Sequence, residues 1–103
     1  MESGQPPDDT LRATVEVRNP KGLHMRAAFA FAKVAARFKA NVTVRNQDKT
    51  ANGKSGIRLM TLGAEPGVKL LLEANGEDAK TAMPVLIKAL GASSADELKD
   101  LLN

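Results

Sequence analysis

The only histidine of this 103-residue chain, His24, stands directly before a long apolar run and two residues before an arginine, Arg26. An imidazole is largely neutral near pH 7, so it can accept a phosphoryl group and still be protonated when the group leaves. Pro20 and Gly22 lie in the loop before it, and the run that follows has helical spacing. A helix beginning here places unpaired backbone N–H groups and the positive end of the helix dipole beside the imidazole. Together with the Arg26 guanidinium, these groups would bind a phosphoryl anion.

Other chemistries are excluded by the composition. The chain has no cysteine and no second histidine, so it lacks the ligands of an ordinary zinc site and the base partner of a nucleophilic triad. We therefore expect no metal and no cofactor. One alternative stays open for His24 itself, because a lone histidine before a helix can simply cap it or pack against the sheet.

Charge and hydropathy limit the partners. The net charge is +3, but the basic residues are scattered among acidic ones, and there is no Trp or Tyr to stack on bases. No apolar run approaches the roughly 20 residues that span a bilayer, and residues 1–10 lack the features of a signal peptide. We therefore expect no nucleic-acid partner, no membrane insertion and a cytoplasmic location, whereas an acidic protein partner fits the charge.

The elements that position His24 follow from the hydrophobic periodicity. Alternating apolar and polar side chains predict strands over residues 11–18, 42–45 and 68–74, with a weak edge strand over residues 49–53 that completes a hairpin. Helical spacing predicts helices over residues 25–39, from the N-cap Ser55 to Gly63, and from residues 75–78 to Leu90, with Ile87 in the apolar stripe of the last one. Pro84 either kinks that last helix or marks its late start.

This order predicts an α+β fold, an open-faced two-layer sandwich in which three helices cover one face of a four-stranded antiparallel sheet (β-α-β-β-α-β-α). We expect one domain over residues 11–91, after a disordered leader over residues 1–10 that has no apolar periodicity. Ser94 and Glu97 have the spacing of a capping box, which predicts a short helical extension within residues 92–103.

The segment Gly22-Leu23-His24-Met25-Arg26-Ala27-Ala28 resembles the active-site motif of the HPr family, the histidine-containing phosphocarrier proteins of the bacterial phosphoenolpyruvate-dependent phosphotransferase system. Residues 54–63 resemble the second signature of the family, and residues 76–78 match the start of its last helix. The three segments occur in the family's order, so the resemblance covers about residues 11–90. The fold of that family is the sandwich predicted above.

The resemblance implies a carrier with a transient phosphohistidine rather than an enzyme. Enzyme I would phosphorylate His24 on its pros nitrogen, Arg26 would stabilise the phosphate, and the group would pass to enzyme II A-type acceptor domains in sugar transport. Ser55 aligns with the serine that HPr kinase/phosphorylase modifies in some members, although capping a helix is its alternative role. A monomer is expected.

A docking surface is expected beside His24. Met25 and Phe29 lie off the core stripe of the first helix, and Ile57 and Met60 lie off that of the second. An exposed apolar patch around a reactive residue usually marks a partner site. We therefore expect these four residues to contact partners.

Two departures from the family pattern keep alternatives open. Ala27 stands where the family usually has a proline in the first helical turn, and Gly56 stands where an apolar residue is usual. The chain would then be a nitrogen-branch or regulatory paralogue that acts through a regulatory acceptor. A non-phosphorylated protein-binding module with the same apolar surface is a further alternative.

Overall fold

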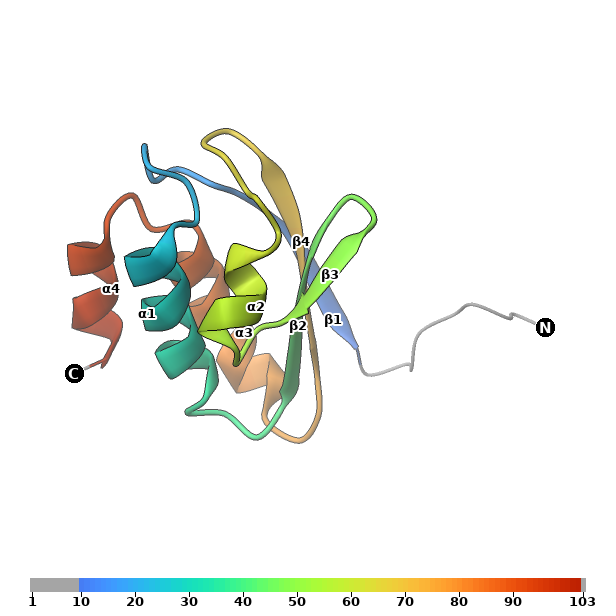
Figure 1. The fold of residues 1–103 in the computed structure, drawn as a ribbon. Helices are drawn as coiled ribbons and strands as arrows, with labels where there is room; N and C mark the ends of the chain where they lie inside the picture. The colour runs from blue at the N-terminus through green and yellow to red at the C-terminus, as the bar shows by residue number, and fades with distance from the viewer. Residues whose placement is uncertain (1–9, 103) are drawn as a thin grey trace.

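The computed structural model describes residues 10–102, except the side chains of Ala95, Lys99, Asp100 and Leu102. Four strands pair antiparallel in the order β1-β4-β2-β3, and the helices lie on one face of this sheet (Figure 1). The predicted α+β sandwich is therefore confirmed. The elements are β1 (Leu11–Glu16), α1 (Met25–Ala35), β2 (Asn41–Asn46), β3 (Lys49–Asn52), α2 (Gly56–Met60), β4 (Lys69–Asn75), α3 (Ala79–Leu90) and α4 (Ala95–Leu102).

The sheet buries alternate side chains against the helices. In β4, Leu70, Leu72 and Ala74 are fully buried, and each stands between neighbours that are only half-buried or exposed. Because side chains alternate between the two faces of a strand, a register shift of one residue would expose this whole set. Large side chains that the helical layer buries against the sheet include Phe31, Leu59, Leu62 and Leu86.

Helix α1 is shorter than predicted, because it ends at Ala35 and not at residue 39. The backbone N–H groups of Lys39 and Ala40 donate to the carboxylate of Asp78 instead, both at 2.8 Å. These two bonds, the one from Lys39 above all, lower the pKa of Asp78. The carboxylate thus turns the chain toward β2 and links it to the start of α3.

Helix α3 passes through Pro84 without interruption, so the alternative of a late start is wrong. Pro84 is exposed, on the side of the helix away from the core. Ile87 is 39% exposed, so the prediction that it belongs to the buried stripe is also wrong. Successive helical residues point about 100° apart, so Ile87 points well away from its fully buried neighbour Leu86 and reaches solvent.

The predicted C-terminal extension is helix α4, which packs against α1 (Figure 1). Leu98 is only 2% exposed, and the Arg37 guanidinium donates to the Leu101 carbonyl at 2.9 Å. The Ser94 hydroxyl accepts the Glu97 N–H at 3.2 Å, as a capping box requires. The Glu97 carboxylate reaches Ser93 rather than Ser94, because it accepts both the Ser93 N–H at 2.9 Å and the Ser93 hydroxyl at 2.8 Å.

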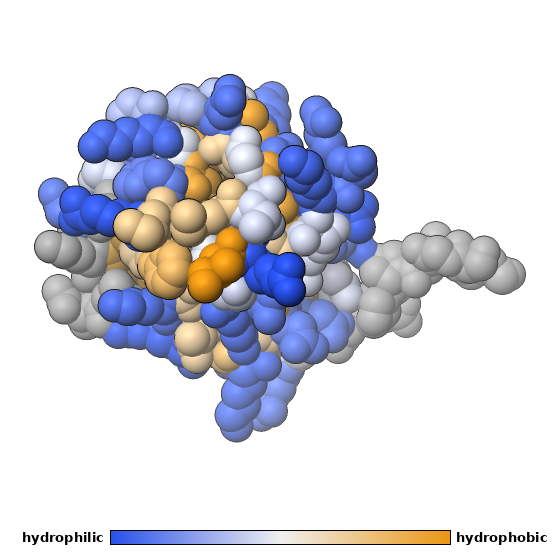
Figure 2. All heavy atoms as spheres, in the orientation of Figure 1, coloured by the Kyte–Doolittle hydropathy of each residue, from blue (hydrophilic) through white to orange (hydrophobic). Residues whose placement is uncertain are grey.

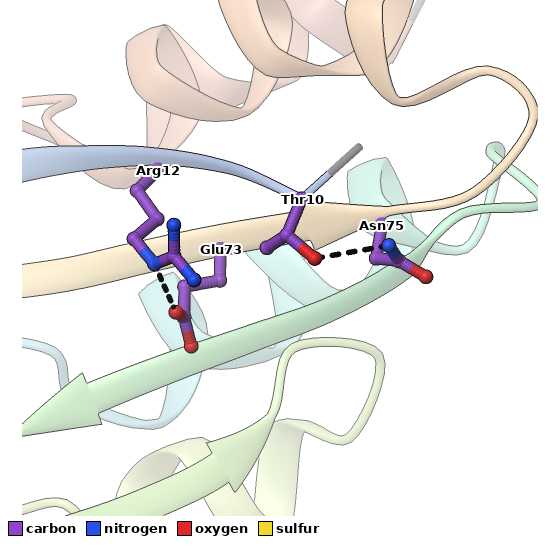
Figure 3. A network of polar contacts seen from close by, with 4 residues as sticks. All are labelled: Thr10, Arg12, Glu73 and Asn75. Carbon is purple, nitrogen blue, oxygen red and sulfur yellow. Dashed lines mark hydrogen bonds and ion pairs between the residues drawn. The ribbon is translucent and has the colours of Figure 1, made fainter. Parts of the chain in front are cut away.

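Polar contacts join β1 to β4 at the edge of the sheet (Figure 3). Arg12 donates to the Glu73 carboxylate at 2.7 Å, and Asn75 donates to the Thr10 hydroxyl at 3.0 Å. Thr10, the last residue of the predicted leader, is therefore bonded to β4, whereas residues 1–9 lie outside the described part of the chain. No helix among the described residues is both long and apolar enough to span a membrane.

Candidate functional site

The loop before α1 is held by its own backbone and by a neighbouring turn. The Gly22 N–H donates to the Asn19 carbonyl at 2.8 Å, and the Leu23 N–H donates to the Ala64 carbonyl at 2.9 Å. Gly22 has a φ of +73°, and a Cβ on it would lie 2.6 Å from the Ala64 oxygen. Only glycine fits here, for both conformational and steric reasons. This packing fixes the point at which the chain delivers His24 to the helix.

His24 is the N-cap residue of α1, and it caps the helix with its backbone alone. It has an extended backbone conformation, its carbonyl accepts the Ala28 N–H at 2.8 Å, and its imidazole makes no capping hydrogen bond. The side chain is half-buried. The imidazole therefore lies at the helix N-terminus, where the positive end of the dipole favours an anion. Its ring nitrogens take no part in capping the helix.

Asn19 contacts the imidazole from the loop. It is only 7% exposed, and its Oδ1 accepts the Lys21 N–H at 2.9 Å. Its amino group therefore faces the ring, with Nδ2 at 3.4 Å from His24 Nε2. A neutral His24 meets this donor best when Nε2 carries the lone pair. The contact orients the ring and does not involve Nδ1.

A cavity of about 300 Å³ opens beside His24 between the loop and the start of α4. The residues that line this cavity carry charges of both signs. Lys21 and Arg26 are basic, and Asp96 is acidic. The two predicted phosphoryl-site residues, His24 and Arg26, thus share one wall. The lining residues are Asn19, Pro20, Lys21, His24, Arg26, Ser93, Ser94 and Asp96.

The four apolar residues expected at a docking surface are all exposed. Met25 is 60% exposed, Phe29 41%, Ile57 67% and Met60 40%. Figure 2 shows apolar side chains gathered over α1 and α2 with hydrophilic ones around them. We call Met25, Phe29, Ile57 and Met60 the apolar patch. Their exposure is confirmed, and their contact with partners stays a prediction.

The departure at Gly56 has a structural reason within this patch. A Cβ built on Gly56 would lie 2.7 Å from both Cγ and Cδ1 of Phe29, so the Phe29 ring occupies the space that a side chain would need. Gly56, the first residue of α2, is buried. The Phe29 ring from α1 thus fills the space that the apolar side chain usual at position 56 would occupy.

Ser55 acts as the N-cap of α2, as predicted. Its hydroxyl oxygen accepts the Arg58 N–H at 3.2 Å, and it is half-buried outside the cavity beside His24. Nothing in this geometry bears on its modification. Among the residues that the structure describes, no group of three His, Asp or Glu side chains could hold a metal ion.

Sequence reasoning missed Asn19, Lys21 and the α4 side of the cavity. Asn19 could have been noticed as a polar residue between two strongly patterned segments, but its contact with the imidazole depends on the fold of the loop. The capping box predicted that a helix begins near Ser94. The sequence around Ser94 did not indicate that the start of this helix lies beside His24.

Comparisons with known proteins give a consistent result. A family model described as the PTS HPr component phosphorylation site matches residues 11–92. The chain is 41% identical to the phosphocarrier protein HPr of Neisseria meningitidis serogroup A over 76 residues, which are 74% of this chain and 85% of that protein. It is 38% identical to the multiphosphoryl transfer protein of Salmonella typhimurium over 88 residues, which are 82% of this chain. That match spans only 23% of the longer protein.

A solved structure agrees with the sequence matches. The phosphocarrier protein HPr of Bacillus anthracis superposes with a TM-score of 0.75 at 29% identity, over 80% of this chain and 98% of that one. The matched family segment ends at residue 92, so α4 lies beyond it.

Proposed function

Since the chain belongs to the HPr family of phosphocarrier components of the phosphotransferase system, we propose that it carries a phosphoryl group on His24, received from phosphorylated enzyme I and passed to an enzyme II A-type domain. The observation that carries this proposal is the placement of His24. Its imidazole is half-exposed at the N-terminus of α1, free of capping bonds, and shares a cavity with the cations Lys21 and Arg26.

The transfer is a displacement at phosphorus between two imidazoles. The bond between phosphorus and the donor's ring nitrogen breaks, and Nδ1 of His24, the pros nitrogen, forms the new bond. Nδ1 attacks with its lone pair, so His24 reacts as the neutral tautomer that carries its proton on Nε2. This proton passes through solvent to the nitrogen that the donor ring frees, and both rings end neutral. Nε2 of the phosphorylated ring then has a lone pair that faces the amino group of Asn19 across the 3.4 Å contact.

The surrounding groups stabilise the transferred phosphoryl group by charge and position. Phosphoryl transfer depends mainly on positioning and on stabilising charge at the three equatorial oxygens. The unpaired N–H groups in the first turn of α1 and the Arg26 guanidinium are the donors proposed for this role. Ala27 keeps an N–H that the proline usual in the family would lack, so the first turn gains one donor.

The apolar patch is the proposed docking surface for both enzyme I and the acceptor. It adjoins His24 through Met25 on α1 and continues onto α2 through Ile57 and Met60. Exposed apolar side chains next to a reactive residue favour association with a partner over solvent exposure. In this role the chain is a carrier in the cytoplasm and not a turnover enzyme.

A regulatory paralogue is the second candidate, favoured by the packing of Phe29 on Gly56. This packing gives the patch a shape that differs from the family pattern, so its acceptor can differ as well. Ser55 modification by a kinase is a separate proposal, in which a phosphate at the start of α2 would add negative charge next to the patch.

A relay assay tests the proposal. The chain is incubated with phosphoenolpyruvate labelled in its phosphate, the enzyme I of the same genome and, in turn, a sugar-type and a nitrogen-regulatory acceptor domain. We expect label to reach an acceptor only when the chain is present, and His24→Ala to abolish this transfer. The acceptor that is labelled separates the sugar-uptake role from the regulatory role. Label that reaches the acceptors equally with His24→Ala would overturn the proposal.

A further inference from the structure

Asn19 presents a fixed hydrogen-bond donor to the imidazole of His24. Its side-chain oxygen Oδ1 accepts the Lys21 N–H at 2.9 Å, and its backbone carbonyl accepts the Gly22 N–H at 2.8 Å. The reverse orientation of the amide would set the Nδ2 donor against the Lys21 N–H, which is also a donor. The amino group is therefore the part of Asn19 that lies 3.4 Å from Nε2 of His24.

The burial of Asn19 makes this contact unusual in the chain. Among the side chains that the structure describes, Asn19 is the only polar one that is buried, with 7% of its surface exposed. Burying an amide costs free energy unless its polar atoms are hydrogen-bonded. The ring of His24 gives Nδ2 a partner at this buried place, so the two side chains depend on each other.

A donor that faces Nε2 favours the forms of the ring in which Nε2 has a lone pair. In unphosphorylated His24 this form is the tautomer with its proton on Nδ1. In the phosphorylated ring Nδ1 is occupied, so a lone pair on Nε2 means a neutral ring and a proton on Nε2 means a cation. Asn19 therefore favours the neutral form of the phosphorylated ring.

The proton on Nε2 decides how readily water removes the phosphoryl group. The oxygen of a water molecule forms a bond to phosphorus, the bond between phosphorus and Nδ1 breaks, and Nδ1 keeps its electron pair. If Nε2 is protonated, a neutral imidazole leaves and both water protons stay on the phosphate. If Nε2 has a lone pair, the ring leaves as an imidazolate, which takes one of the water protons. The protonated ring is the better leaving group, so hydrolysis proceeds mainly through the cation.

Charged groups around the ring act on the same protonation. Lys21 in the loop, Arg26 in α1 and Asp96 at the start of α4 line the cavity together with His24. The two basic side chains disfavour a cationic ring, and the acidic one favours it. Asn19 differs from all three because its amino group contacts Nε2 itself.

We propose that Asn19 is a positioning residue that keeps Nε2 of phosphorylated His24 unprotonated and thereby protects the phosphoryl group from hydrolysis. This inference rests on the proposed phosphocarrier function. A carrier leaves its donor before it meets its acceptor, and the half-buried ring of His24 stays in contact with solvent during that time. The lifetime of the phosphohistidine then limits how much of the carrier arrives loaded.

The test changes the group that faces Nε2 and keeps the turn. Asn19→Asp puts a carboxylate oxygen in place of the amino group, and its other oxygen still accepts the Lys21 N–H. Asn19→Ser keeps an acceptor for that N–H on a shorter side chain that does not reach the ring. The matched control is Asn52→Asp. Asn52 is exposed, its Oδ1 accepts the Lys54 N–H at 2.9 Å in the same arrangement, and it lies outside the cavity.

The first readout is the lifetime of the phosphohistidine. Each protein is phosphorylated with phosphoenolpyruvate and the enzyme I of the same genome, and enzyme I is then removed by size exclusion. Phosphorus NMR follows the loss of the phosphoryl group in mildly alkaline buffer, where the neutral ring predominates. We expect hydrolysis to be about threefold faster for Asn19→Ser and about tenfold faster for Asn19→Asp, with Asn52→Asp within about twofold of the wild type, because a hydrogen bond to a charged group is the stronger one.

The second readout is one that a merely structural role of Asn19 would not move. Nitrogen NMR of the unphosphorylated proteins reports which ring nitrogen of His24 carries the proton. We expect the fraction protonated on Nδ1 to be largest in the wild type and in Asn52→Asp, smaller in Asn19→Ser and smallest in Asn19→Asp. This readout needs no phosphorylation, so it also covers a variant that enzyme I no longer accepts.

The outcomes separate this inference from the function on which it rests. If the wild type is phosphorylated and both Asn19 variants lose the group as slowly as it does, the protective role is overturned and the carrier function stands. If the wild type takes no phosphoryl group from enzyme I, both are overturned. Faster hydrolysis with an unchanged nitrogen spectrum reports a loosened loop and overturns the role of Nε2. Equal acceleration in Asn52→Asp reports net charge alone and overturns it as well.

Discussion

Replacing Gly56 by alanine should change the stability in a direction that depends on Phe29. The new Cβ would lie 2.7 Å from the Phe29 ring, whereas ordinary contact begins at 3.4 Å, so the ring must move outward. Forced movement of this kind typically costs about 1–3 kcal/mol. The φ of Gly56 is not positive, so alanine fits the backbone and should return about 0.4–1 kcal/mol by restricting the unfolded chain. We expect a net loss of about 1 kcal/mol in the free energy of unfolding.

The sign should reverse when the ring is absent. In a Phe29→Ala background the methyl group of Gly56→Ala has room, so only the gain of about 0.4–1 kcal/mol remains. Urea unfolding of the wild type, the two single variants and the double variant gives the coupling free energy directly, provided that the m-values agree. We expect a coupling of at least about 1 kcal/mol, which is typical of residues in contact.

A matched control uses Met25, the other exposed apolar side chain of α1 in the patch. Gly56→Ala should be destabilising in a Met25→Ala background, as it is in the wild type. If Gly56→Ala is equally stabilising with and without the Phe29 ring, the ring does not lie over Gly56, and our reason for the departure from the family pattern is wrong.

Three further effects follow from single contacts. The lowered pKa of Asp78 means that its ionised carboxylate stabilises the fold above the unfolded pKa, near 3.9, and that this stability is lost as the pH falls through the folded pKa. Thermal unfolding midpoints should therefore fall more steeply below about pH 4 for the wild type than for Asp78→Asn, and parallel curves would contradict this. Pro84→Ala should raise the free energy of unfolding by about 1–3 kcal/mol in urea, since a proline within a helix removes a backbone hydrogen bond; a loss of stability would contradict it. Glu73→Gln should change it by less than about 1 kcal/mol, because both side chains of the ion pair with Arg12 are partly exposed to solvent, and a larger change would show a stronger pair than the geometry indicates.

The features that could be predicted from the sequence depend on local patterns. The start of α1 after His24, the cap of α2 by Ser55 and the cap of α4 by Ser94 each follow from a few neighbouring residues. Alternation predicted β2 and β4 because each of these two strands has one buried face. The resemblance to a family supplied the expected roles of His24 and Arg26, which composition and spacing could not.

The features that could not be predicted depend on packing between distant segments. Helix α1 ends early because Asp78, about 40 residues further on, bonds the backbone that follows it. Ile87 has the same hydrophobicity as its buried neighbours, and only the orientation of α3 decides that it faces solvent. The contribution of α4 to the cavity likewise requires Leu98 to be buried in the core, which a helical pattern alone does not specify.

The central claim is that His24 accepts the phosphoryl group, and intact mass spectrometry tests it most directly. The wild type and His24→Ala are incubated with phosphoenolpyruvate and the enzyme I of the same genome, then measured at neutral and at acid pH. We predict a gain of one phosphoryl group that is lost in acid, as a phosphohistidine should be, and that is absent from His24→Ala. An unchanged wild-type mass, or the same gain in His24→Ala, would contradict the account.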